Sequence, residues 1–231
     1  MGKYLDSYSL LENEFKVWGK NAPLQPPPWF EDQVLLFSDA VEKASYGKKT
    51  ESIQILQKIR SDEMRTWFES LGQHAGMYRV AKLSTQSSAK LSADQLDTLR
   101  APAKFEKAVF ERDSYLCRYC GLKVVAKKVL TAFEKAVGKS NFSSQGTSAQ
   151  QHGILHGFKI VADHVVPHRL GGRTDLNNLV TSCPACNYGK YYYTIEQLGI
   201  DDPRDRPPVK SDWDGLTSFI EGLKQYQLSD I

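Results

Sequence analysis

The sequence predicts an α+β fold, in which a small core of short strands and one helix is flanked by mostly helical N-terminal and C-terminal regions. Three observations support this prediction. Apolar residues recur at helical spacing in the first hundred residues and again near the C-terminus. Between these regions, short apolar runs followed by Gly and Pro are typical of strands that end in turns. Two Cys-x-x-Cys pairs lie in the same central region and predict that it is held together through its cysteines.

Residues 1–100 are predicted to form a helical accessory region, because they carry no chemical motif. The expected elements are helices over 9–18, 31–46 and 50–72 and a polar, serine-rich loop over 84–92. Thr50 is the expected N-cap of the third helix, since its hydroxyl can accept a backbone N–H. Residues 21–28 are rich in proline, which cannot continue a helix, and are expected to form a stiff connector. We expect the helices to pack around the core; binding of a protein partner or of DNA is the alternative.

Residues 101–200 are predicted to form the core, and residues 201–231 a connector followed by a last helix. The expected core elements are a helix over 102–113, a short strand that leads into the first Cys-x-x-Cys turn over 115–121, an amphipathic helix over 127–137, a polar loop over 141–153 and a helix that ends at 194. Pro102 suits the first turn of a helix, where a missing N–H loses no partner. Asp212 is the expected N-cap of the last helix.

The composition is that of an ordinary globular protein. Hydrophobic residues make up 41% of the 231 residues and charged residues 25%, which is close to the average for such proteins. The start of the chain contains no apolar run of the length that a signal peptide or a membrane span needs. It also has Asp6 where a myristoylation signal has Ser or Thr. We therefore expect a cytoplasmic protein with no membrane partner.

Positive charge is concentrated in the central region. Residues 101–193 contain thirteen Lys or Arg and six Asp or Glu, a formal charge of +7. The whole chain carries +3, so the remaining residues carry −4. A basic surface near the cysteines is what phosphate binding requires, and it predicts DNA as the partner. An uneven but solvated surface is the alternative, and the acidic remainder is compatible with a protein partner bound through the N-terminal helices.

The four cysteines of the chain are Cys117, Cys120, Cys183 and Cys186, and all belong to the two Cys-x-x-Cys pairs. Two such pairs supply the four thiolates of a tetrahedral zinc site, which is structural because no coordination position remains for a substrate. Disulfides are the alternative, but a chain without an export signal favours metal binding. A redox-active site would need only one pair. We therefore expect one structural Zn²⁺.

Asp163 and His164 are adjacent and precede a turn-forming stretch with one proline and two consecutive glycines. Imidazole titrates near neutral pH, so His164 can take a proton from water. The carboxylate of Asp163 is a hard oxygen ligand suited to Mg²⁺ or Mn²⁺. Adjacent side chains on a strand point to opposite faces, so the two groups can act at one site if the strand end bends. Further along, Asn187 can offer its amide oxygen to the same ion.

Three cations near these residues are candidates for phosphate contact: Arg169, Arg173 and Lys190. Lys190 follows Asn187 by three residues, so the two share a face if this stretch is a helix. For each of the three cations, a solvated surface position without a ligand is the alternative.

The stretch from Val161 to Lys190 resembles the HNH nucleases, whose core is a ββα-metal unit. Asp-His-x-x-Pro, Gly-Gly, Asn-Leu, Cys-x-x-Cys-Asn and Lys, in this order, carry the resemblance, and the cysteines match the zinc-bearing branch of the family. The resemblance implies that His164 is the general base, with Asp163 and Asn187 as ligands of the catalytic metal. It also implies that Asn178 holds the loop that bears the base.

The resemblance implies a metal-dependent endonuclease that hydrolyses DNA with a His general base and one Mg²⁺ or Mn²⁺ ion, in restriction or antiviral defence. It covers about 105–193, where 122–160 is an insertion that the compact family pattern lacks, so target choice is not implied. Two alternatives remain: a nuclease effector subunit active only in a multiprotein complex, and a non-catalytic zinc module that binds nucleic acid. The intact Asp163, His164 and Asn187 argue against the second alternative.

Overall fold

The structure is a computed structural model that describes residues 22–72 and 102–227. Its helices and strands are α2 (Phe30–Ser45), α3 (Lys49–Leu56), α4 (Ser61–Trp67), η1 (Phe68–Gly72), α6 (Ala103–Arg112), α7 (Lys127–Val137), α8 (Gly153–Phe158), β1 (Val161–His164), η3 (His168–Leu170), β2 (Leu179–Ser182), α9 (Pro184–Lys190), α10 (Ile195–Leu198), η4 (Thr217–Phe219) and α11 (Ile220–Gln225). The predicted helix over 9–18 and the predicted loop over 84–92 lie outside the described residues. No helix in the described ranges combines the length and the apolar character that a membrane span needs.

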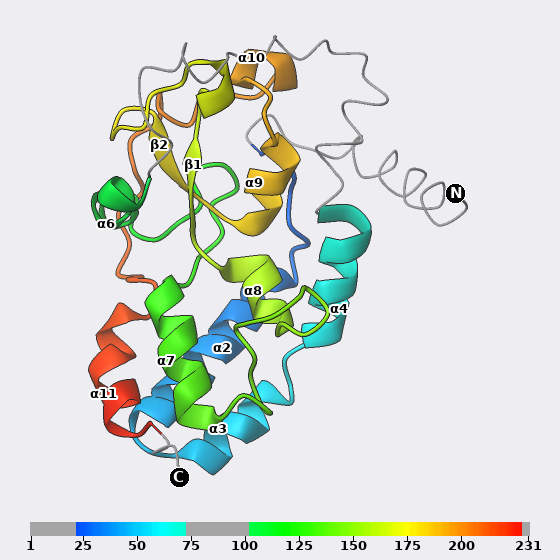
Figure 1. The fold of residues 1–231 in the computed structure, drawn as a ribbon, viewed down its shortest axis with the longest axis vertical. Coiled ribbons are helices and arrows are strands. Elements are labelled where there is room, and N and C mark those ends of the chain that lie inside the picture. The colour runs from blue at the N-terminus through cyan, green and yellow to red at the C-terminus, as the bar shows by residue number, and fades with distance from the viewer. Residues whose placement is uncertain (1–21, 73–101, 228–231) are drawn as a thin grey trace.

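The two strands lie near one end of the molecule, and α2, α3, α7 and α11 lie at the other (Figure 1). β1 and β2 are antiparallel, and their register runs from Val161 opposite Ser182 to His164 opposite Leu179. α9 follows β2 after one residue and packs against β1. The described residues therefore form a mixed α+β fold with a small two-strand sheet, which confirms the predicted α+β class.

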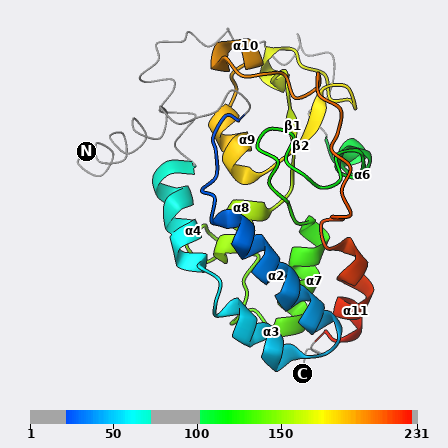
Figure 2. The same ribbon diagram turned by 180° about the vertical axis from the view of Figure 1, so that it is seen from behind.

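The helical end is assembled from three separate parts of the chain. α2 and α3 come from the N-terminal region, α7 from the predicted insertion and α11 from the C-terminal region (Figures 1 and 2). α7 packs against α2, α3 and α11. The rings of Phe37, Phe133 and Phe142 meet between them, with centroids 5.1 to 5.4 Å apart. The insertion therefore shares one hydrophobic core with both terminal regions.

Residues 22–28 run beside α9 and lead from the sheet end into α2 (Figure 2). The thiol of Cys186 donates to the carbonyl oxygen of Leu24 at 3.3 Å. A Cβ at Gly189 would lie 2.6 Å from the Cβ of Leu24, so only glycine permits this approach. The proline-rich connector is thus packed against the helix that completes the central unit.

Three predicted helices agree closely with the structure, since 31–46 corresponds to α2, 102–113 to α6 and 127–137 to α7. The single predicted helix over 50–72 is wrong, because the chain breaks into α3, α4 and η1. The backbone N–H of Arg60 donates to the side chain of Gln33 on α2, at 2.8 Å, in place of a helical partner. Thr50 is not an N-cap: it lies inside α3, which begins at Lys49 without a side-chain cap.

The predicted helix end at 194 is also wrong, because α9 stops at Lys190. Tyr191 has a φ of 54°, which ends the helix. Thr194 instead caps the short α10, where it and Gln197 form a capping box. These two residues carried a recognisable signal, since Thr and Gln three apart predict a helix start.

Two smaller expectations also differ from the structure, and the predicted polar loop agrees with it. The short strand predicted before the first Cys-x-x-Cys turn is reduced to an isolated bridge between Leu116 and Lys123. Asp212 is not the N-cap of the last helix: Phe219 precedes α11 without a side-chain cap, and the carboxylate of Asp214 accepts the Ser218 N–H of η4 at 2.7 Å. The predicted loop ends where α8 begins, at a glycine whose Cβ would lie 2.1 Å from the carbonyl oxygen of Ser61.

Candidate functional site

The sulfur atoms of the four cysteines lie within 4.8 Å of one another. The two pairs are joined by the backbone, because the N–H of Arg118 donates to the carbonyl of Thr181 on β2 at 2.8 Å. Cys117, Cys183 and Cys186 are buried, and all four cysteines are free thiols. The cluster can therefore hold a metal ion, and four sulfur ligands suit a tetrahedral Zn²⁺.

The thiols of this cluster have unequal affinities for protons. Burial raises the pKa of Cys117, but hydrogen bonds from the other three cysteines outweigh it and hold this pKa well below its usual value. Burial and hydrogen bonds with the other three cysteines raise the pKa of Cys186 well above its usual value. A cation that displaces the remaining protons would let all four sulfurs become thiolates.

The carboxylate of Asp163 is anchored through one of its two oxygens. Oδ2 accepts a hydrogen bond from the hydroxyl of Tyr119 at 2.7 Å and lies 3.3 Å from Nζ of Lys190. Within the described parts of the chain, Oδ1 has no such partner. Burial raises the pKa of Asp163, although the Lys190 charge and the Tyr119 hydrogen bond act in the opposite direction. A buried carboxylate with one oxygen available fits a further cation.

Lys190 lies inside the molecule and not on a DNA-facing surface. Its side chain is 1% exposed, and Nζ donates to the carbonyl oxygen of His164 at 2.7 Å. A buried ammonium is costly unless it is paired, and Asp163 supplies the partner. The expected phosphate contact by Lys190 is therefore corrected, because the packing of α9 on β1 turns this residue inward.

Asn187 is partly exposed and lies three residues before Lys190 on α9. Residues three apart on a helix share a face, so Asn187 lies on the side of α9 that faces β1. Its amide group has no hydrogen-bond partner among residues 22–72 and 102–227. The amide oxygen can therefore serve as a ligand near Asp163.

His164 has a different set of neighbours from Asp163, as strand alternation predicts. Its Nε2 lies 2.9 Å from the hydroxyl oxygen of Thr174, and its ring centroid lies 5.7 Å from that of His168. The residue is 5% exposed. The imidazole is therefore held by the loop that joins β1 to β2, while the carboxylate is held by the first cysteine pair and α9.

Asn178 closes the loop between β1 and β2. Its Oδ1 accepts the Val166 N–H at 2.8 Å, and its Nδ2 donates to the carbonyls of Val166 and Arg173 at 3.0 and 2.8 Å. A Cβ at Gly172 would lie 1.9 Å from the carbonyl oxygen of Val166, so only glycine fits there. The closed loop keeps Thr174 in contact with His164.

The two arginine candidates in this loop have different surroundings. The side chain of Arg173 is 67% exposed and lies 3.5 Å from the carboxylate of Asp175. The guanidinium carbon of Arg169 lies 3.7 Å from the ring centroid of Tyr192. Its Nε is buried and has no partner among the described residues. Both arginines lie in the loop that holds His164, and their guanidinium groups contact different partners: the carboxylate of Asp175 for Arg173 and the ring of Tyr192 for Arg169.

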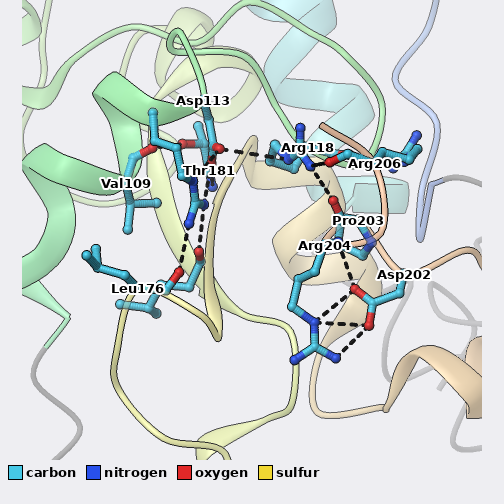
Figure 3. A network of polar contacts seen from close by, with 11 residues as sticks. Val109, Asp113, Arg118, Leu176, Thr181, Asp202, Pro203, Arg204 and Arg206 are labelled. Carbon is cyan, nitrogen blue, oxygen red and sulfur yellow. Dashed lines mark hydrogen bonds and ion pairs between the residues drawn. The ribbon is translucent and has the colours of Figure 1, made fainter. Parts of the chain in front are cut away.

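A buried polar network connects β2 with α6 and with the C-terminal connector (Figure 3). Asp113, 1% exposed, accepts two hydrogen bonds from Arg112, at 2.8 and 2.9 Å, and one from the N–H of Thr181 at 2.8 Å. Arg118 extends the network to the C-terminal connector, where it donates to the carbonyls of Pro203 and Arg206. The network joins α6, the first cysteine pair, β2 and the connector into one scaffold.

Three residues of the site were not predicted from the sequence: Tyr119, Thr174 and His168. Tyr119 lies between the first two cysteines, and nothing in the spacing shows that it meets Asp163, 44 residues away. Thr174 and His168 lie in the loop after His164, where polar residues are common and carry no distinctive signal. Their contacts depend on how the loop closes.

Residues 155–192 match the family model described as HNH endonuclease. The searches of curated proteins and of solved structures found no match. The matched residues include β1, the loop closed by Asn178, β2 and α9. The four-cysteine cluster is compatible with the zinc-bearing branch of this family. The similarity to HNH endonucleases is therefore limited to residues 155–192, which carry the candidate site.

Proposed function

We propose that this protein is a metal-dependent endonuclease that hydrolyses phosphodiester bonds in DNA. The observation that carries the proposal is that two adjacent side chains on β1 are held in place by different sets of neighbours. The carboxylate of Asp163 is fixed by Tyr119 and Lys190, and the imidazole of His164 by Thr174. This arrangement suits a site in which one residue holds a cation and the other moves a proton.

Asp163 and Asn187 would hold a Mg²⁺ or Mn²⁺ ion, since both offer oxygen atoms, which these ions prefer. When bound, such an ion withdraws charge from the phosphate and stabilises the leaving oxygen. Tyr119 and Lys190 keep the Oδ2 atom of Asp163 in place and leave its other oxygen for a ligand. Lys190 also offsets the negative charge of the buried carboxylate.

His164 acts as the general base in this proposal. The imidazole accepts a proton from the attacking water, whose oxygen bonds to phosphorus as the bond to the 3′ oxygen breaks, and the 3′ oxygen takes a proton from solvent. The products are a 5′-phosphate and a 3′-hydroxyl. Thr174 orients the imidazole through Nε2, and Asn178 holds the loop that carries Thr174.

The cysteine cluster is proposed to bind one structural zinc. It lies next to the catalytic residues, because Tyr119 sits between Cys117 and Cys120 and contacts Asp163. Zinc would hold the first cysteine pair against the second, and would thereby position the Tyr119 hydroxyl. Arg169 and Arg173 remain the proposed phosphate contacts. A role in restriction or antiviral defence is proposed from the resemblance to nucleases of such systems.

The test is cleavage of supercoiled, linear and single-stranded DNA by the purified, zinc-loaded chain with Mg²⁺, with Mn²⁺ and with a chelator. We expect cleavage that requires the divalent ion and is lost in His164→Ala. The matched control is His152→Ala, which removes an imidazole of the helical end and should leave cleavage unchanged in folded protein. Failure of the parent to cleave any substrate, or equal cleavage by His164→Ala, would contradict the proposal.

A further inference from the structure

We infer that Tyr191, with Tyr192 and Arg169, forms a stacking site for an unpaired base of the DNA substrate. The inference rests on the proposed nuclease function and names a class of substrate for it: DNA with at least one unpaired base near the bond that is cut. Single-stranded DNA, a flap and a distorted duplex belong to this class, and a regular duplex does not.

The three side chains form a row beside the candidate catalytic residues. The guanidinium of Arg169 covers the ring of Tyr192 at 3.7 Å, and the ring centroids of Tyr192 and Tyr191 are 4.0 Å apart. Arg169 directly follows His168, whose ring contacts that of His164. Tyr191 directly follows α9, the helix that carries Asn187. The row therefore connects the loop of the general base with the end of the metal-ligand helix.

The backbone of Tyr191 is in a conformation that disfavours a large side chain. Its φ is 54° and its ψ is −119°, at a helix end where glycine or asparagine is the usual residue. The side chain is 44% exposed, so burial against the protein offsets only part of this strain. Strained residues of this kind gather at functional sites, where a ligand makes use of the side chain. The exposed part of the Tyr191 ring is thus the part that a base would cover.

The neighbouring charge fits a nucleotide better than an apolar partner. Every base has a flat π-face, and stacking on tyrosine together with a nearby arginine is how single strands are bound without regard to sequence. Among the described residues, Arg169 forms no hydrogen bond or ion pair, and its Nε is buried without a partner. Its charge is therefore available to the phosphate next to the stacked base. In a regular duplex the base faces are covered by their neighbours, so the site selects unpaired bases.

The experiment measures binding of a short single-stranded DNA that contains the fluorescent base 2-aminopurine, without added divalent ions, so that no cleavage occurs. We expect quenching of the fluorescence by the parent protein, and weaker binding of the fully paired duplex of the same sequence. Tyr191→Gly should bind the single strand about 5- to 150-fold more weakly, the range for the loss of one stacked base. Tyr191→Phe keeps the ring and should bind like the parent.

The glycine variant also separates this role from a structural one. Glycine adopts positive φ without strain, so Tyr191→Gly should have a melting temperature equal to or above that of the parent. Tyr46→Gly is the control: Tyr46 is 64% exposed and joins α2 to α3, and these two helices lie at the opposite end of the molecule from the strands (Figure 1). It should leave DNA binding unchanged.

The outcomes distinguish this inference from the proposed function. If Tyr191→Gly binds the single strand as tightly as the parent, or if Tyr191→Phe is as weak as Tyr191→Gly, the stacking site is refuted even when the protein cleaves DNA. If the parent shows stacking that depends on Tyr191 but cleaves no DNA with Mg²⁺ or Mn²⁺, the nuclease function fails and the stacking site stands.

Discussion

Replacing Tyr119 by Phe removes one hydroxyl group and tests how the cysteine cluster supports Asp163. Tyr119 is 2% exposed, and its hydroxyl donates to Oδ2 of Asp163 at 2.7 Å. After the substitution, Oδ2 keeps only Lys190, at 3.3 Å. A hydrogen bond to a charged group contributes about 1.5–3 kcal/mol, and loss of the group behind a metal ligand costs about 10- to 100-fold in metal affinity. We expect Tyr119→Phe to bind Mn²⁺ about 10- to 100-fold more weakly.

The measurement is calorimetric titration of Mn²⁺ into parent and variant, with the zinc content of each determined by elemental analysis. The zinc content should not change, because Tyr119 supplies no ligand to the cysteine cluster. Tyr46→Phe removes a hydroxyl from a residue that is 64% exposed and should match the parent. Equal Mn²⁺ affinity in Tyr119→Phe and the parent, at equal zinc content, would refute the idea that this hydroxyl positions Asp163.

Three further predictions concern the metals and the dependence on pH. Cys117→Ser should abolish zinc binding and unfold the sheet end, since structural zinc contributes on the order of 10 kcal/mol; active parent protein without zinc would contradict this. His164→Ala should reduce the cleavage rate by about 10²–10⁴-fold and still bind Mn²⁺, whereas Asp163→Ala should no longer bind Mn²⁺. If calorimetry shows that His164→Ala loses Mn²⁺ and Asp163→Ala keeps it, the assignment of base and metal ligand is reversed. Burial, followed by the nearby charge of Arg65, lowers the pKa of His152 to about 4 from 6.5. The unfolded chain therefore binds this proton more readily than the folded chain. The free energy of unfolding is highest above pH 6.5 and decreases as the pH falls toward 4, by about 2 kcal/mol at pH 5. Thermal unfolding between pH 7 and 5 tests this, and His152→Gln should reduce the loss.

Asp113 shows why the support of the site could not be predicted. The sequence presents it only as the last residue of a predicted helix, yet it joins α6 to β2 and to the first cysteine pair. Its partner Thr181 lies 68 residues away, and a contact over that distance depends on the whole fold. The same reason explains the break between α3 and α4, where the Arg60 N–H donates to the side-chain oxygen of Gln33 and not to a helical carbonyl.

The sequence by itself determined the features that local chemistry dictates. Regular apolar spacing predicted α2 and α7 almost to the residue, since periodicity reflects which face of a helix is buried. The two Cys-x-x-Cys pairs predicted the cluster of four thiols, because two such pairs supply the four ligands of one tetrahedral metal site. The order of motifs from Asp163 to Lys190 likewise indicated the family whose model residues 155–192 match.

Only the tertiary structure decided how these parts meet. Packing of α9 on β1 turned Lys190 inward to Asp163, although its position on the helix face also permitted contact with solvent. Closure of the loop by Asn178 brought Thr174 to His164, and the strained turn after α9 left the ring of Tyr191 exposed. Each of these outcomes depends on distances between residues far apart in the chain, and side-chain spacing along the sequence contains no information about such distances.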